Sequence, residues 1–578
     1  MRPAPARKPG PRIDPVQLTA AVVGVLVGLY ALLAGLTAWI AGTLFGRGAP
    51  HVRLLEIGPV LVRLPQHLGD PRVAWAAADS RLLPGPVGYY AALLLAVLLL
   101  GVLAAPLVWG ALLASGLLEP GPTDGPDDRP HPFRSRSVAE RPSDALATRK
   151  DLADLLVDAP QPGRVVLGHA FGKLVASQVE HSVLVVGATR SGKTRGFAIP
   201  AVIDWAGPAI VLSAKTDLLH ATFEQRRKIG PVWVFDPTGV SGVPTSTWSP
   251  LGQAETWGGA LRVADAMSKL SRATGGLGGS DHWQIVAAQL LAPLLHAAAL
   301  AKLDMGDVLG WVKSQDCDPA LRALYLAGAE AAVDSVRATL KTEPRQRDSA
   351  FSTCRTVLDA YEDPAVLEAS RDCGIRPERL LGGGPSTVFL VATAAEQQRL
   401  APLFLALVDE LTRATLRRAS EERASSGFAV RSDADRVLLL LDEAANIAPI
   451  PNLAALASVA GGEGLQLVTI YQDLSQVRHA YRDEWGSIAS NHVVKVVLPG
   501  VSDPETLRYF SSVVGDEETL EVLETRDSSG RTSRSEHIAR GPVVPLRALR
   551  EQRINSGWLV SGARPAGQIR LRTQSPVA

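Results

Sequence analysis

The sequence predicts two transmembrane helices followed by an α/β domain with a mainly parallel sheet, into which an all-helical domain is inserted. Three observations lead to this prediction. Two long segments near the start of the chain carry no charged residue, short apolar runs alternate with helical stretches after about residue 150, and one long interval within that alternation has almost no strand signal. Apolar runs that alternate with helices are typical of a parallel sheet covered on both faces.

Length and composition set the scale of the molecule. At roughly 100–200 residues per domain, a chain of 578 residues contains about three or four structural units. Its 59 Lys and Arg residues balance 58 Asp and Glu residues, so the net charge of +1 neither indicates nor excludes a polyanionic partner. The three cysteines, Cys317, Cys354 and Cys373, lack metal-ligand spacing, and their odd number argues against a disulfide framework. A reducing compartment is therefore expected.

The first region, residues 1–118, is predicted to be a membrane anchor. Residues 15–46 and 82–118 contain no charged side chain, and each run exceeds the ~20 apolar residues that a bilayer crossing needs. A cleaved signal peptide is the alternative for the first run, but its apolar region is longer than the usual 7–15 residues and a second run follows it. We expect transmembrane helices at about 16–45 and 86–118.

The charges that flank the first span predict its orientation. Arg2, Arg7, Lys8 and Arg12 precede it, which favours a cytoplasmic N-terminus, although the loop at 47–81 also carries arginines. Two crossings return the chain to its starting side. The sequence therefore predicts a multi-pass protein of the cell membrane with both termini and the α/β domain in the cytoplasm.

A linker follows the anchor. Residues 119–150 contain six prolines and many charges, a composition that cannot bury a core. After this segment the sequence predicts the strands of the α/β domain. The runs that we expect to contain strands are RVVLG (164–168), HSVLVVG (181–187), PAIVLSAK (208–215), PVWVFDP (231–237), STVFLVA (386–392), RVLLLLDE (436–443), LQLVTIYQ (465–472) and HVVKVVLPG (492–500).

One interval interrupts this alternation. Between Pro250 and about Pro377 the sequence has Ala- and Leu-rich runs at helical spacing and almost no strand signal. We therefore expect an all-helical domain at 251–377, inserted into an α/β domain formed by 151–250 and 378–578. Near the end of the chain, RDSSGRTSRSEHIARG is predicted to be an exposed polar loop.

The stretch GATRSGKT matches the phosphate-binding pattern G-x-x-x-x-G-K-[ST]. An apolar strand precedes it and a helix is expected to follow it, which is the context that the pattern requires. Backbone N–H groups of such a loop face the phosphates, the lysine contacts the β and γ oxygens, and the threonine hydroxyl binds Mg²⁺. The predicted nucleotide-binding residues are Gly187, Ala188, Thr189, Arg190, Ser191, Gly192, Lys193 and Thr194.

An acidic pair supplies the second part of the predicted site. Asp442 and Glu443 end the wholly apolar run RVLLLLDE. Asp442 is suited to hold the Mg²⁺ shell together with Thr194, and Glu443 is suited to polarise an attacking water. The alternative is that the pair caps a helix that begins at Glu443.

A glutamine closes another predicted strand. Gln472 ends LQLVTIYQ, and a polar amide at the end of a strand that neighbours the acidic pair could sense the γ-phosphate and transmit its loss. The alternative is a glutamine that caps the next turn. Glu443, Lys193 and Gln472 are thus the predicted catalytic residues.

These motifs occur in an order that resembles a known family. GATRSGKT is followed by SAKTD (213–217), FDPTG (235–239), WSPL (248–251), HWQIVAAQLL, LLDEAANI (440–447) and GLQLVTIYQDLSQV (464–477). The same order is found in the TraG/TraD-type coupling proteins of type IV secretion and conjugation. The resemblance covers most of the chain from about residue 160 and includes the two N-terminal spans.

The resemblance implies a membrane-anchored, hexamer-forming ATPase with a RecA-like domain, which binds ATP and Mg²⁺ and delivers a relaxase together with single-stranded DNA to a type IV secretion channel. It places the family's phosphate loop on residues 187–194, its acidic pair on Asp442 and Glu443, and its post-strand glutamine on Gln472. The chain departs from the family at two places. Ser213-Ala214-Lys215-Thr216-Asp217 replaces Asp-x-Lys-Gly-Glu, and Trp248-Ser249-Pro250 replaces Tyr-Asn-Pro.

Two other readings remain open at this point. A double-stranded DNA translocase of the FtsK type would share the anchor and the core, but it would carry a C-terminal winged-helix module that the last 80 residues do not suggest. A docking receptor that binds nucleotide without hydrolysing it is the other reading. In a ring, an arginine from a neighbouring subunit is expected at the nucleotide, and Arg399 and Arg482 are candidates because they follow predicted strands.

Overall fold

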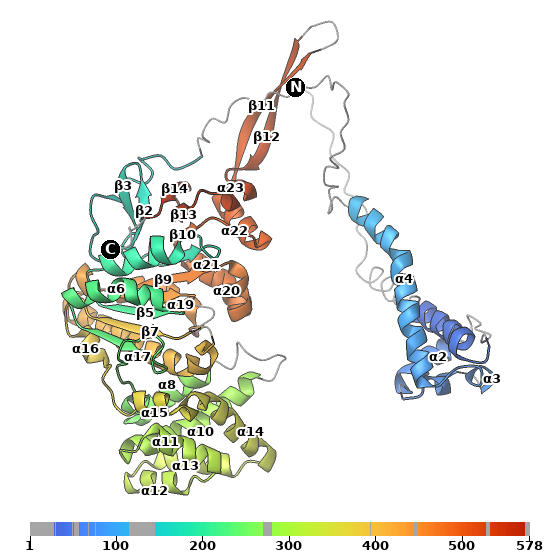
Figure 1. Cartoon of the computed structure of the whole chain (residues 1–578), viewed down its shortest axis with the longest axis horizontal. Coiled ribbons are helices and arrows are strands. Elements are labelled where there is room, and N and C mark those ends of the chain that lie inside the picture. The colour runs from blue at the N-terminus through green and yellow to red at the C-terminus, as the bar shows by residue number, and fades with distance from the viewer. Residues whose placement is uncertain are drawn as a thin grey trace, which may run out of the picture. The chain divides into compact units, whose positions relative to one another are not determined.

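The computed structural model divides the chain into two compact units, residues 1–130 and 131–578 (Figure 1). Each unit is described by itself. The structure describes residues 28, 30–48, 50, 57–67, 69–75, 77–114, 145–269, 280–393, 395–443, 449–526 and 532–572.

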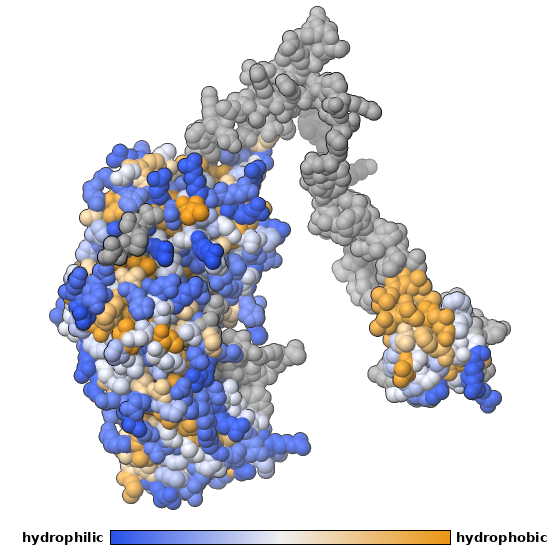
Figure 2. Space-filling view, viewed as in Figure 1, coloured by the Kyte–Doolittle hydropathy of each residue, from blue (hydrophilic) through white to orange (hydrophobic). Residues whose placement is uncertain are grey.

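The first unit is helical. Residues 30–40 are helical, and the elements that follow them are η1 (Ala41–Phe45), α2 (Ile57–Arg63), η2 (Leu64–Gln66), η3 (Pro71–Ala74), α3 (Ala77–Ser80) and α4 (Pro86–Ala114). A small core forms where Tyr89 of α4 packs with Trp75, whose indole N–H donates to the Tyr89 hydroxyl at 3.3 Å. Other apolar side chains of α4, including Val87 and Leu94, are exposed, and Figure 2 shows apolar residues covering part of this helix.

The two predicted membrane spans fall partly outside the described residues. The part that is not described includes residues 16–27 and 29 of the first predicted span, residues 115–118 of the second, and the predicted linker up to residue 144. Within the described residues, we found no helix that combines the length and the hydropathy of a membrane crossing. The two transmembrane helices therefore stay a prediction.

The second unit is built on a twelve-stranded mixed sheet. Seven parallel strands form its centre, and each lies within one of the predicted apolar runs. In spatial order these strands are β10 (Val494–Val497), β4 (Val183–Val186), β9 (Leu465–Tyr471), β8 (Val437–Asp442), β5 (Ala209–Ser213), β7 (Thr387–Val391) and β6 (Val232–Phe235).

The central strands are mostly apolar because both faces of the sheet are covered. Successive residues of a strand point to opposite faces. Accordingly, Val183 and Val185 of β4 belong to one hydrophobic cluster, and Leu184 and Val186 belong to another. Helix α6 (Thr216–Ile229) contributes Leu218 and Leu219 to the first cluster, and the prediction of a parallel α/β centre is confirmed.

The eighth predicted run, RVVLG, contains part of a strand of a different kind. It lies in an antiparallel extension of the sheet beyond β10, which the prediction of a mainly parallel sheet did not include. The extension consists of β13 (Ser556–Ser561), β14 (Gly567–Arg570), β2 (Val166–Ala170), β3 (Lys173–Ala176) and β1 (Leu156–Val157). This extension thus combines strands from the beginning and the end of the second unit. The Ala147 N–H donates to the Ala566 carbonyl at 2.8 Å in the same region.

Between β6 and β7 the described residues form helices and no strand. These helices are α7 (Leu251–Ala254), α8 (Trp257–Ser268), α10 (Ser280–Leu300), α11 (Met305–Ser314), α12 (Asp318–Leu326), α13 (Glu330–Leu340), α14 (Pro344–Val357), η5 (Asp359–Glu362), α15 (Pro364–Ala369) and α16 (Pro377–Leu381). Helix α10 is central, since its residues from Leu290 to Leu295 are almost all fully buried and it packs against α8, α12, α13 and α14. We call this segment the helical interval. One hydrophobic cluster runs without a break from Leu184 and Leu212 of the sheet to Leu294 and Tyr361 of the helical interval.

The remaining helices follow β7, β8, β9 and β10 and complete the layers. They are α17 (Gln397–Ser426), η6 (Asp433–Asp435), α19 (Leu453–Val459), η7 (Gly461–Glu463), α20 (Leu474–Tyr481), η8 (Arg482–Glu484), α21 (Trp485–Asn491), α22 (Pro504–Val514) and α23 (Leu546–Arg550). Helix α17 packs Leu403, Phe404 and Leu407 into the cluster that joins the sheet to the helical interval.

The prediction of a polar loop in RDSSGRTSRSEHIARG is wrong for the described residues 526 and 532–541, and residues 527–531 lie outside the described part. Strand β12 (Thr532–Pro542) pairs with β11 (Asp516–Arg526) in an antiparallel ribbon, which projects from the part of the unit that holds α22 and α23 (Figure 1). Cross-strand backbone pairing, such as Glu518 opposite Arg540, defines these strands. The sequence pattern missed β12 because Ile538 is its one large apolar residue, so apolar alternation gives no strand signal.

Candidate nucleotide-binding site

Four strands bring the predicted site residues to one edge of the sheet. β4, β9, β8 and β5 are neighbours in this order and run parallel, so their carboxyl ends lie at the same edge. The phosphate loop follows β4, Gln472 follows β9, and Asp442 and Glu443 lie at the end of β8. Ligands of parallel α/β sheets bind outside the carboxyl ends of the strands.

The phosphate loop has the backbone that its glycines permit. The Gly187 N–H donates to the Tyr471 carbonyl at 3.1 Å, which ties the start of the loop to β9. A Cβ atom at Gly187 would stand 2.6 Å from the Ser191 hydroxyl, and Gly192 has a left-handed φ of 102°. Arg190 also has a left-handed φ, of 66°, and is exposed at the loop tip beside Thr189.

A helix begins where the motif requires one. η4 (Lys193–Ala198) starts directly after Gly192 and continues into α5 (Ile199–Asp204). The first N–H groups of a helix lack partners within the helix and attract anions. Ala188 and Thr194 are half-buried on either side of the loop. The loop is thus arranged to hold phosphate at a helix N-terminus.

Lys193 is buried inside the loop. Its ammonium group donates to the carbonyls of Gly187 at 2.5 Å and Ala188 at 2.8 Å. Burial lowers the pKa of Lys193, while the carboxylates of Asp442 and Glu443 act in the opposite direction. The two carboxylates favour the charged form of this buried ammonium group, which keeps a positive charge inside the loop.

Asp442 is a buried acid with a free acceptor. It is 3% exposed; the Ser213 hydroxyl lies 3.4 Å from Asp442 Oδ2, and Asp442 Oδ1 has no hydrogen-bond partner among the described residues. Burial, followed by the charge of Glu443, raises the pKa of Asp442 to about 6, whereas Lys193 and Lys215 lower it. A buried carboxylate oxygen without a donor is costly unless a cation satisfies it.

Glu443 has a strained backbone and one cationic partner. Its φ of 58° is left-handed, a conformation that costs a non-glycine residue on the order of 1–2 kcal/mol. Its Oε1 lies 3.4 Å from Lys215 Nζ. The alternative that Asp442 and Glu443 cap a helix beginning at Glu443 concerns the chain beyond 443, and residues 444–448 lie outside the described part.

Gln472 lies between the two motifs. β9 separates the phosphate-loop strand β4 from β8, so the residue that follows β9 stands between them. The Gln472 N–H donates to the Gln476 side chain at 3.0 Å, and its own side-chain amide makes no hydrogen bond within the described residues. The position agrees with a sensing role, and the side chain that accepts the bond at this turn is that of Gln476 and not that of Gln472. Both interpretations of Gln472 remain predictions.

The two candidate arginines differ. Arg399 is held within the chain by Asp363 at 3.1 Å and Glu396 at 2.5 Å. Arg482 is exposed, has a left-handed φ of 46°, and forms no ion pair in the described part of the chain. Arg482 is therefore the better placed of the two to reach another molecule.

The site fits Mg²⁺ and a nucleotide. Its oxygen donors are the Thr194 hydroxyl and the unsatisfied Asp442 carboxylate, and oxygen is the ligand that Mg²⁺ prefers. The Ser191 hydroxyl is also buried without a partner among the described residues, inside the turn that would surround a phosphate. Lys193 and the start of η4 supply the positive groups.

Other contributors were missed by the sequence prediction. Ser213 touches Asp442 across 229 positions of sequence, and Lys215 contacts Glu443. Asn555 and Leu571 both come within 3.2 Å of where a Cβ of Gly192 would stand. The SAKTD motif marks the first pair in the sequence without indicating a role for either residue. For Asn555 and Leu571 the sequence contains no signal, because only the fold brings them to the loop.

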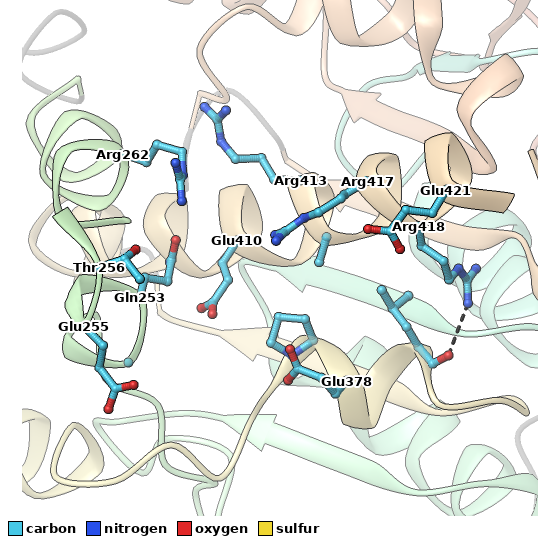
Figure 3. Close-up of a pocket in the computed structure, with 14 residues that line it drawn as sticks. Gln253, Glu255, Thr256, Arg262, Glu378, Glu410, Arg413, Arg417, Arg418 and Glu421 are labelled. Carbon is cyan, nitrogen blue, oxygen red and sulfur yellow. Dashed lines mark hydrogen bonds between the residues drawn. The ribbon is translucent and has the colours of Figure 1, made fainter. Parts of the chain in front are cut away.

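A separate cavity lies where α7, α8, α16 and α17 meet (Figure 3), and we call it the junction cavity. Its volume is about 500 Å³, and none of the predicted site residues lines it. Figure 3 shows Glu410 and Arg417 of α17 and Arg262 of α8 extending into this space. The Trp248 indole N–H donates to Glu410 at 2.7 Å, and burial is the main cause that raises the pKa of Glu410 to about 7.

Residues 139–540 match the family model of the type IV secretory system conjugative DNA transfer proteins. The chain belongs to this family. Two conjugal transfer proteins TraG illustrate the relationship: one from Escherichia coli is 28% identical over 375 residues, which cover 61% of this chain and 57% of that protein, and one from Rhizobium radiobacter is 25% identical over 391 residues, which cover 62% and 56%. The chain thus spans a little over half the length of these relatives. The prediction of a TraG/TraD-type coupling protein is confirmed.

Solved structures show the same fold. The bacterial conjugative coupling protein TrwBdeltaN70, in a trigonal form with sulphate, has a TM-score of 0.57 at 18% identity and covers 77% of this chain and 96% of its own. TrwB in complex with ADP and Mg²⁺ has a TM-score of 0.55, also at 18% identity, and covers 74% of this chain and 92% of its own. The fold of this family member is therefore TrwB-like, a large mixed sheet with helices.

Proposed function

We propose that this chain is a membrane-anchored ATPase that couples a relaxase–DNA substrate to a type IV secretion or conjugation channel and drives DNA transfer by ATP hydrolysis. The observation that carries the proposal is the convergence of Lys193, Asp442 and Glu443 at one edge of the sheet of a coupling-protein family member. The TrwB complexes with ADP and Mg²⁺ and with a non-hydrolysable ATP analogue support the choice of ligand.

In this proposal, different residues bind the phosphates, hold the metal ion and activate the water. Lys193 and the start of η4 would bind the β- and γ-phosphates, and Thr194 and Asp442 would hold Mg²⁺, which would supply positive charge against the phosphates. Glu443 orients the attacking water and takes its proton, while the bond between the γ-phosphorus and the bridging oxygen breaks and its electrons leave with ADP. Gln472 lies where it can report loss of the γ-phosphate to β9.

The assembly and the location belong to the same proposal. A homohexamer would place an exposed arginine such as Arg482 near the nucleotide of a neighbouring subunit. Two spans would fix the chain in the cell membrane with both termini in the cytoplasm. Reporter fusions after residue 65 and after residue 150 should then read outside and inside, and finding both on one side would contradict this topology.

DNA transfer by two variants tests the motor. Glu443→Gln keeps the shape of the side chain and most of the nucleotide affinity but removes the proton acceptor, whereas Lys193→Ala weakens binding itself. Both variants should abolish transfer if hydrolysis drives it. Full transfer by a hydrolysis-dead Glu443→Gln protein would instead identify a docking receptor that needs nucleotide only to hold its shape.

A further inference from the structure

The strand order places the ends of β5 and β8 side by side at the site. Leu212 of β5 pairs with Leu441 of β8 in parallel register. Lys215 follows Leu212 by three residues, and Glu443 follows Leu441 by two, so both side chains start from the same edge of the sheet. Lys215 Nζ lies 3.4 Å from Glu443 Oε1. The pairing of β5 with β8 is therefore sufficient to bring these two side chains into contact.

Ser213 organises the turn that presents Lys215. Its hydroxyl accepts from the Lys215 N–H at 3.3 Å and lies 3.1 Å from the Lys215 carbonyl. The same hydroxyl lies 3.4 Å from Asp442 Oδ2. Since a serine hydroxyl has a single hydrogen, it donates to one of these two oxygens at a time. The Ser213 hydroxyl thus stabilises the turn after β5 through the Lys215 backbone and lies beside Asp442, the residue before Glu443.

The backbone of Glu443 does not determine where its carboxylate lies. The left-handed φ of 58° takes the residue out of the alternation of β8. Asp442 is adjacent and also acidic, and two neighbouring carboxylates repel each other. Of the cations at this edge, Lys193 is held on the carbonyls of Gly187 and Ala188, whereas Lys215 forms an ion pair with Glu443 itself.

We propose that Lys215 is a positioning residue, which fixes one oxygen of Glu443 so that the other faces the attacking water. The inference rests on the proposed ATPase function. Because the Lys215 side chain is 50% exposed, the ion pair should contribute little to stability. Its effect should instead be on the chemical step, since misplacing a general base slows catalysis far more than it weakens folding.

The test uses the purified full-length protein and the variants Lys215→Ala, Lys215→Arg, Glu443→Gln and the double variant Lys215→Ala/Glu443→Gln. Lys215→Ala should lower kcat by at least about tenfold and change KM for Mg-ATP and the affinity for a non-hydrolysable ATP analogue less than about threefold. Lys215→Arg should recover part of kcat. On the Glu443→Gln background, Lys215→Ala should have no further effect. Lys313→Ala, which removes a comparably exposed ion pair to Glu362, is the control and should change nothing.

The outcomes separate this inference from the function on which it rests. No ATP hydrolysis by the wild-type protein would overturn the proposed function. Hydrolysis that Glu443→Gln removes and Lys215→Ala leaves intact would overturn the role of Lys215 alone. So would an Ala variant whose loss appears in analogue affinity or in melting temperature, or one whose effect adds to that of Glu443→Gln.

Discussion

Two carboxyl groups with raised pKa values, the buried Asp442 and the half-buried Glu410, lie in different parts of the second unit, and their surroundings differ. Asp442, at the nucleotide edge, has a pKa raised to about 6, two lysines that act against this shift, and one oxygen without a partner among the described residues. Glu410, at the junction cavity, has a pKa raised to about 7 and accepts a hydrogen bond from Trp248. Burial shifts both groups in the same direction, so a raised pKa does not by itself mark a functional site. The free oxygen and the nearby lysines distinguish Asp442.

The largest expected effect is a difference in ATP hydrolysis between a variant at the nucleotide edge and a variant at the junction cavity. Glu443→Gln should lower ATP hydrolysis by a factor on the order of 10²–10⁴, the scale on which a general base acts. Glu410→Gln, a matched change at the junction cavity, should leave hydrolysis within about twofold, because none of the predicted site residues lines that cavity. Steady-state hydrolysis by both variants measures the difference. A comparable loss in Glu410→Gln would mean that the cavity takes part in catalysis.

The second prediction concerns pH and stability at Glu410. Its pKa in the folded protein, about 7, lies above the 4.5 of an ordinary glutamate, so the folded state binds more protons between these values. The stability that Glu410 contributes should therefore fall as the pH rises from 4.5 to 7 and level off above 7. Burial is the main cause, Glu378 and Asp409 add to it, and Trp248 and Gln253 oppose it.

Denaturant unfolding of the wild type and of Glu410→Gln at several pH values checks this prediction. The difference between their free energies of unfolding should change by about 3 kcal/mol across the window, in favour of Gln at the higher pH. Groups that titrate in both proteins cancel from this difference. A difference that stays constant with pH would show that Glu410 has an ordinary pKa.

The third prediction concerns Lys193. Its replacement by Ala should weaken nucleotide binding about 10- to 150-fold, because a hydrogen bond to a charged group contributes about 1.5–3 kcal/mol. Equilibrium binding of a fluorescent ATP analogue measures this loss, with Lys313→Ala as a control outside the site. If Lys193→Ala bound the nucleotide with unchanged affinity, the phosphate loop would not be part of the nucleotide-binding site.

The smallest effect is expected at Trp248. Trp248→Phe removes the hydrogen-bond donor to Glu410 and should cost about 1–2 kcal/mol of stability at pH 8, where the carboxylate is ionised, and less at pH 5. Trp485→Phe is a suitable control, because that ring also packs against an aromatic neighbour, Tyr509, at 5.9 Å. An equal, pH-independent cost in both variants would mean that packing and not the hydrogen bond accounts for the loss.

The sequence predicted the parts of the fold that depend on local patterns. The seven central strands lie in short, mostly apolar runs because both faces of the sheet are buried, whereas the apolar residues of the helical interval recur at helical spacing. The antiparallel strands were largely missed. β14 (Gly567–Arg570) has only four residues with alternating burial, and β12 has one large apolar residue, so neither offers a pattern that differs from a loop.

The candidate site was predictable only where its residues are contiguous. The phosphate loop and the acidic pair are short motifs next to strands, so sequence order alone brings their members together. The Ser213 contact to Asp442, the Lys215 ion pair and the approach of Asn555 to Gly192 depend on strand order. No spacing rule gives such contacts, because the parallel neighbours of a strand can lie hundreds of residues away.

The unbroken hydrophobic cluster from Leu184 in the sheet to Tyr361 in the helical interval has a thermodynamic consequence. Elements that share one core lose their packing together, so the sheet and the helical interval should melt as a single cooperative body. A molecule that binds only the helices would then raise the melting temperature of the nucleotide edge as well, by mass action on the shared folded state. Binding at the helices would thereby stabilise the phosphate loop without a conformational change between the two regions.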